Sequence, residues 1–146
     1  MLFLAALLLA QTAPAPCAAM DTGLPPALAG WNARNTELVP GGGALALSTV
    51  SLPTITKPGD APTDQIEWNF AIAKAGRYGI ALDNAAWIDV VPAAGGDPLT
   101  SVAHGHGPEC STIRKIVRFD LTPGAYRLRL SKLPGSTVKV MLVAGE

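Results

Sequence analysis

The feature that most constrains the fold is a period-two alternation of apolar residues that recurs along the chain. The first clear run carries large apolar side chains at every second position: Ile66, Trp68, Phe70 and Ile72. Because successive side chains of a strand point to opposite faces, this spacing predicts a half-buried strand with one inward face. The alternation returns over 78–82, 113–119 and 126–130. No stretch has convincing helical periodicity, so the pattern predicts an all-β protein.

Turn-forming residues separate these runs. Lys74–Arg77 predicts a turn, and hence a hairpin that pairs 66–72 with 78–82. Four further short strands are predicted at 44–49, 86–91, 99–103 and 137–143, whereas the three prolines between Leu52 and Thr63 indicate a loop or edge segment. About eight short strands with regular turn signals are typical of an antiparallel β-sandwich or jelly roll.

An internal echo supports this architecture. Gly76–Leu82 and Gly124–Leu130 share a Gly-x-Tyr start followed by alternating aliphatic residues. With 146 residues the chain is short enough for one domain. We therefore expect a signal and cleavage region over 1–19, an extended arm over 20–43 and a β-sandwich domain over 44–146. In the arm, Trp31 is expected to be an apolar anchor.

The first ten residues form an apolar run, Met1–Ala10, which is too short to span a bilayer because a spanning helix needs about 20 apolar residues. Small residues follow, so the segment is interpreted as a secretory signal, although no Lys or Arg precedes it. We expect a periplasmic or secreted protein without a membrane span. The cleavage point stays open, near Gln11 or near Ala18–Met20.

That cleavage point decides the state of the two cysteines. A cut before Cys17 leaves an even pair in an oxidising compartment and favours a Cys17–Cys110 disulfide. The bridge would close a loop of roughly 90 residues and contribute on the order of 4 kcal/mol. A cut after Cys17 leaves Cys110 alone beside two histidines, where a thiolate would serve as a metal ligand.

The charge pattern offers little attraction for nucleic acid, because eleven basic residues balance eleven acidic ones. Four basic residues of the predicted strands are expected to form a basic ribbon across neighbouring strands: Arg118, Arg127, Arg129 and Lys139. Such a ribbon is usually a solvated sheet face, and it is sometimes a surface for an anionic glycan or a protein partner. The oligomeric state has no sequence signal.

The candidate site is the segment 104–110, which contains both histidines of the chain. His104 and His106 would face the same way from a strand and could converge on one ion. Glu109, Cys110 or Asp89 would complete a shell for Cu, Zn or Fe. The alternative interpretations are a polar connection without metal and a metal-free binding site. Lys115 shares strand parity with Val117, which places a cation on an otherwise apolar face.

His104-Gly105-His106 followed by Glu109 resembles the first motif of the cupin family, which implies a strand-borne metal site in a jelly roll. The interval between His106 and Glu109 is shorter than in that family, and no further histidine is present for a second motif. Most of the chain after Gly23 also resembles a group of small exported bacterial proteins, some of them labelled homogentisate 1,2-dioxygenase. The resemblance rests on Gly76-Arg77-Tyr78, on 87–91 and on 104–115, and it implies iron as a metal to test.

Three functions therefore stand at this point. The first is an exported β-sandwich that binds a transition metal through the histidine segment. The second is a structural or ligand-binding module with a Cys17–Cys110 disulfide and no metal. The third, implied by the resemblance, is a metal-dependent oxygenase. Whether the protein is an enzyme is left open by the residues themselves.

Overall fold

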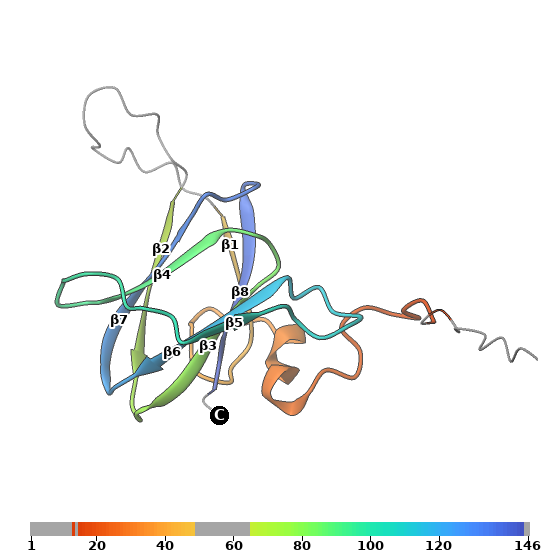
Figure 1. The fold of residues 1–146 in the computed structure, drawn as a ribbon, viewed down its shortest axis with the longest axis horizontal. Coiled ribbons are helices and arrows are strands. Elements are labelled where there is room, and N and C mark those ends of the chain that lie inside the picture. Colours follow the sequence, from red (N-terminus) through yellow and green to blue (C-terminus); the bar gives the residue numbers. More distant parts are fainter. Residues whose placement is uncertain (1–12, 14, 49–64, 145–146) are drawn as a thin grey trace, which may run out of the picture.

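The computed structural model describes residues 13, 15–48 and 65–144 (Figure 1). In this part of the chain it contains a short 3-10 helix and eight strands. Their bounds are η1 Pro26–Asn32, β1 Leu45–Ser48, β2 Ile66–Ile72, β3 Gly76–Leu82, β4 Trp87–Pro92, β5 Ala103–Gly105, β6 Lys115–Leu121, β7 Gly124–Ser131 and β8 Thr137–Val143.

The strands form two antiparallel sheets. One has the order β1-β8-β3-β6-β5 and the other the order β2-β7-β4. The first four strands alternate between the two sheets, and so do β6, β7 and β8, which is the winding of a jelly roll. The predicted all-β sandwich is therefore confirmed.

The main core lies between the sheets. Its largest fully buried side chains come from the inward positions of both layers, among them Ile80, Leu82, Leu128 and Leu142. The alternation read from the sequence accounts for this, since Ile66, Phe70 and Ile72 are all buried while Glu67 and Asn69 are exposed. The predicted inward face of β2 is confirmed.

The predicted hairpin between β2 and β3 is wrong. β2 pairs with β7, and β3 pairs with β6 and β8, so the turn at Lys74 carries the chain from one sheet to the other. Alternation defines which side chains face inward, but two consecutive strands can bury those faces against each other as readily as they can pair edge to edge. The strand predicted at 99–103 is also displaced, because β5 contains only 103–105.

The internal echo has a structural meaning. Its two copies are β3 and β7, which are the central strands of their respective sheets. Tyr78 donates a hydrogen bond to the carbonyl of Lys74 at 2.5 Å, and Tyr126 donates one to the carbonyl of Thr122 at 2.7 Å. In both cases the acceptor lies four residues upstream, so each tyrosine closes the corner that leads into its central strand, as tyrosine corners do in other sandwiches.

The outer face of the five-stranded sheet is covered by the arm that contains η1 (orange in Figure 1). Trp31 is completely buried there, with Leu28, Ile116 and Met141 in the same cluster. The expected anchoring role of Trp31 is confirmed. The five-stranded sheet thus has apolar contacts on both faces. Within the described residues, no helix has the length and apolar character needed to cross a membrane.

Two expectations fall largely outside the described residues. They are the secretory signal at the N-terminus, for which residues 1–12 and 14 are not described, and the proline-rich loop or edge segment between β1 and β2.

Candidate functional site

A cavity of about 450 Å³ lies where edge strands of the two sheets face each other. Trp87 and Ile88 contribute to it from β4, at the edge of the three-stranded sheet. The opposite wall comes from β5 and β6 and the chain beside them, and its residues are Ser101, His104, Gly105, His106, Lys115 and Val117. This cavity is called the edge cleft below. Its lining residues include a tryptophan, aliphatic residues and several residues with hydrogen-bonding groups, which is the usual composition of a ligand site.

Trp87 is the most exposed large hydrophobic side chain in the described part of the chain, at 56%. Two contacts hold its ring. The indole Nε1 donates a hydrogen bond to Asp89 Oδ1 at 3.1 Å, and Lys132 Nζ lies over the ring at 5.4 Å from its centroid. An exposed indole held in one orientation can offer a flat apolar surface to a ligand without losing much conformational freedom on binding.

The two histidines line this same cleft. His104 is in β5, opposite Val117 of β6, so it occupies the inward parity at the sheet edge. His106 follows β5, and its Nδ1 lies 3.4 Å from the carbonyl oxygen of Arg114. Both side chains are exposed. The structure therefore brings the two imidazoles to one cavity as alternating neighbours along the chain.

Lys115 enters the cleft from the first position of β6. Its parity is that of Val117 and Phe119, as expected from the sequence, and it is partly buried. Its Nζ donates hydrogen bonds to the carbonyl oxygens of Ala86 and, at 3.4 Å, Ala85. Burial and the neighbouring charge of Arg114 lower the pKa of Lys115 below its ordinary value.

The other candidate metal ligands are not brought to the edge cleft. Glu109 is exposed in the following turn, and Asp89 accepts the indole hydrogen bond of Trp87. Cys110 is bonded to Cys17, so its sulfur is not available as a thiolate. Over the described ranges there is no group of three or more His, Cys, Asp or Glu residues suited to hold a metal ion.

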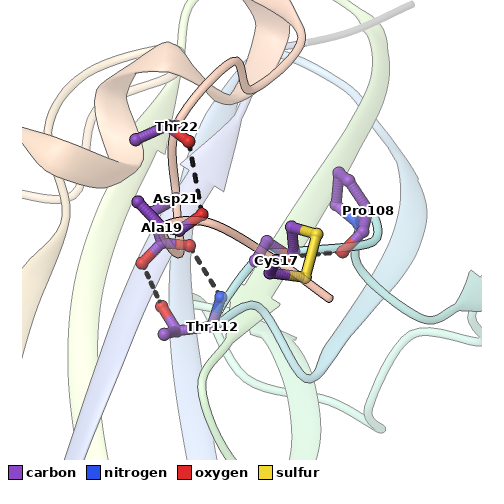
Figure 2. Close-up of a disulfide and its surroundings, with 8 residues drawn as sticks. Cys17, Ala19, Asp21, Thr22, Pro108 and Thr112 are labelled. Atoms are coloured by element: carbon purple, nitrogen blue, oxygen red, sulfur yellow. Dashed lines mark hydrogen bonds between the residues drawn. A yellow bond between two sulfur atoms is a disulfide. The ribbon is translucent and has the colours of Figure 1, made fainter. Parts of the chain in front are cut away.

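The Cys17–Cys110 disulfide, which the sequence left as one of two alternatives, is present (Figure 2). Beside it, Asp21 Oδ1 accepts a hydrogen bond from the Thr112 backbone N–H at 2.6 Å, and Oδ2 accepts one from Thr112 Oγ1 at 2.5 Å. The Trp31 Nε1 donates to the same Thr112 hydroxyl at 2.9 Å. These contacts, together with the disulfide, are called the arm clamp below, since they fasten the N-terminal arm to the segment after the histidines.

The arm clamp perturbs Asp21. Burial by itself would raise the pKa of this carboxyl, but the hydrogen bonds from Thr112 and the charge of Lys139 outweigh burial and lower it. Lys139 Nζ also lies over the Trp31 ring, 4.4 Å from its centroid. A close backbone approach completes the region, because a side chain at Gly107 would meet the Ile113 carbonyl oxygen at 2.3 Å. Glycine at this position lets the loop pack down between the cleft and the clamp.

The predicted basic ribbon is not formed. Arg127 and Arg129 lie in β7, whereas Arg118 and Lys139 lie in the other sheet, on β6 and β8 with β3 between them. The two arginines of β7 are also compensated, since Glu67 lies 3.8 Å from Arg127 Nε and 3.0 Å from Arg129 Nε. Equal parity along separate strands does not place side chains on one face unless those strands share a sheet.

Trp87 is a residue of the candidate site that was not predicted from the sequence. The signal was available: Ile88 and Val90 supply the inward positions of β4, so Trp87 falls on the outward parity with Asp89 and borders the cleft only at its rim, where β4 begins. A tryptophan on the solvent side of a strand is a better indication of a binding surface than one on the core side. Comparison with family models, with curated proteins and with solved structures found no match to this chain.

Proposed function

We propose that this protein is an exported binding module that recognises a saccharide in the edge cleft. The observation that carries the proposal is Trp87, an exposed indole held beside a cavity lined with imidazole, ammonium and hydroxyl groups. Tryptophan is enriched at binding interfaces, because its ring is largely apolar and its N–H group is polar.

The chemistry of the edge cleft suits a sugar. A pyranose ring has an apolar face of C–H groups, which can cover the indole of Trp87 and remove both surfaces from water. Its rim carries hydroxyl groups, which both donate and accept hydrogen bonds. The Ser101 hydroxyl, the imidazoles of His104 and His106 and the Lys115 ammonium supply donors and acceptors in the same cavity.

Export is supported by two independent features. The apolar Met1–Ala10 run has the composition of a signal core, and disulfides persist mainly in oxidising compartments. If the signal is removed, a cut upstream of Cys17 retains the disulfide, whereas a cut near Ala18–Met20 would discard it. We therefore favour processing before Cys17 and a periplasmic or secreted location.

The proposal is tested by calorimetric titration with a panel of neutral and acidic oligosaccharides. We expect Trp87→Ala to weaken binding about tenfold or more, because it removes the stacking surface. The matched control is Val102→Ala, which trims another exposed apolar residue that does not line the cleft. Failure of the parent protein to bind any member of the panel, or equal affinity in the Trp87→Ala variant, would contradict the proposal.

A second candidate, binding of a transition metal, is favoured by one observation: both imidazoles line a single cavity. Two histidines without a carboxylate or thiolate form an incomplete shell, so water or a ligand would have to fill the remaining positions of Cu²⁺ or Zn²⁺. The described residues do not supply the two-histidine, one-carboxylate set of a non-haem iron oxygenase.

A further inference from the structure

The edge cleft contains a cation without a counter-ion. Elsewhere in the described chain, several cations lie beside carboxylates: Arg77 pairs with Asp120 at 3.0 Å, and the two arginines of β7 share Glu67. Lys115 differs, because its Nζ bonds to backbone carbonyl oxygens and no carboxylate of the described residues lies within ion-pair distance. The residues that line the cleft include no Asp or Glu.

The position of Lys115 indicates where a counter-ion would bind in the cleft. Its side chain leaves β6 on the inward face and reaches the carbonyls of Ala85 and Ala86, which precede β4. An ammonium has three N–H donors, so the two carbonyls leave capacity for one more acceptor. Since Lys115 lines the cavity together with His104 and His106, an acceptor that enters the cleft meets three nitrogen-bearing side chains and no competing carboxylate.

We propose that the saccharide bound in the edge cleft is acidic, and that its carboxylate pairs with Lys115 while a neighbouring ring of the sugar chain covers Trp87 at the rim of the cleft. This inference rests on the proposed saccharide-binding function. A carboxylate supplies the charge that the cleft lacks, and a hydrogen bond between two charged groups in a partly dry site is stronger than one between neutral groups. Uronic acids carry such a group on a pyranose ring.

The perturbation of Lys115 agrees with this assignment. Partial burial and the adjacent Arg114 charge both disfavour the ammonium form and lower its pKa, and neither is relieved by an anion in the unliganded protein. A bound carboxylate would offset both effects. The cleft would therefore favour an acidic ligand over a neutral one of the same shape.

The test compares oligogalacturonate with its methyl ester, two probes that share the sugar chain and differ in charge. In calorimetric titrations of the full chain we expect the acid to bind about tenfold more tightly than the ester, and the preference to shrink as salt is added. Lys115→Gln should abolish the preference while retaining an N–H donor for the Ala86 carbonyl. Lys115→Arg, which keeps the charge, should retain part of it. Lys74→Met removes an exposed cation that does not line the cleft, so it should leave the preference unchanged.

The outcomes separate the two proposals. Equal binding of acid and ester by the parent protein would overturn the acidic preference and leave saccharide binding in place. Absence of binding for both probes, and for the wider oligosaccharide panel, would overturn both. A preference that survives intact in Lys115→Gln would overturn the assignment to Lys115. If thermal melting shows that this variant does not fold, the parent comparison of acid with ester decides the question of charge.

Discussion

The arm clamp and the edge cleft share one short segment, 104–115, but they differ in how their charged groups are paired. In the arm clamp, the Asp21 carboxylate accepts two hydrogen bonds from Thr112, and Thr112 in turn accepts one from the buried Trp31. In the edge cleft, Trp87 is exposed and Lys115 has no described carboxylate partner. The middle of the segment, at Cys110 and Thr112, is bonded within the protein, whereas the histidines and Lys115 at its two ends line the cleft.

Under the proposed function, the difference assigns stability mainly to one region of the fold and recognition mainly to the other. A region whose donors, acceptors and apolar surface are matched within the chain contributes mainly to folding. A region with an exposed ring and an uncompensated cation gains more from a ligand than from its own chain. The disulfide and Gly107 hold the loop at the boundary, so the clamp can position the cleft without lining it.

The comparison is tested most sharply with the two tryptophans that belong to the two regions. We expect Trp31→Ala to lower the free energy of unfolding by about 3–5 kcal/mol, because it empties a fully buried site. Trp87→Ala should change it by about 0.5 kcal/mol or less, as an exposed substitution does. Urea denaturation followed by circular dichroism measures both. Similar losses in the two variants would remove the distinction between clamp and cleft.

Removal of the disulfide is the next largest expected effect. The bridge joins residues 93 apart, so its loss releases the unfolded chain and should lower the free energy of unfolding by about 4 kcal/mol in a Cys17→Ala, Cys110→Ala variant. The control is the parent protein unfolded with its disulfide intact and again after reduction. A variant as stable as the oxidised parent would show that the arm is held by its noncovalent contacts alone.

A smaller, pH-dependent effect is expected at Asp21. Its pKa is lowered in the folded protein, so its stabilising contribution is complete above the unfolded value near 4 and is lost as the pH falls through the lower folded pKa. Asp21→Asn should cost about 1 kcal/mol at neutral pH, and asparagine tolerates the positive φ of this position. Denaturation at pH 7 and at pH 2 should show parent and variant converging in acid; a constant difference would argue against a stabilising role of the Asp21 carboxylate.

The smallest expected effect concerns the two imidazoles. Calorimetric titration with Cu²⁺ or Zn²⁺ should reveal weak binding that is lost in a His104→Ala, His106→Ala variant, because two histidines make only part of a coordination shell. Unfolding free energies of parent and variant should agree in metal-free buffer, since both side chains are exposed. Equal stoichiometry in the two proteins would exclude the histidines as metal ligands.

The candidate site was only partly predictable. The histidine segment was recognisable because metal-binding residue types are rare and close together there, and the inward parity of Lys115 followed from alternation. The partners across the cleft were not, because Trp87 lies on β4 of the other sheet and meets the histidines only through the packing of two edges. The basic ribbon failed for the same reason: parity is a property of one strand, whereas a shared face is a property of the sheet.

By itself, the sequence determined the class of the fold, the bounds of the final strand at Thr137–Val143 and the inward face of β2, because these depend on local alternation and turns. It also limited disulfide pairing to one bond, since only two cysteines are present. The tertiary structure decided that β2 pairs with β7 instead of β3, that the disulfide forms, and that a tryptophan, two histidines and a lysine share one cleft. These outcomes depend on contacts between residues far apart in the chain, which packing of the whole core selects and local pattern does not encode.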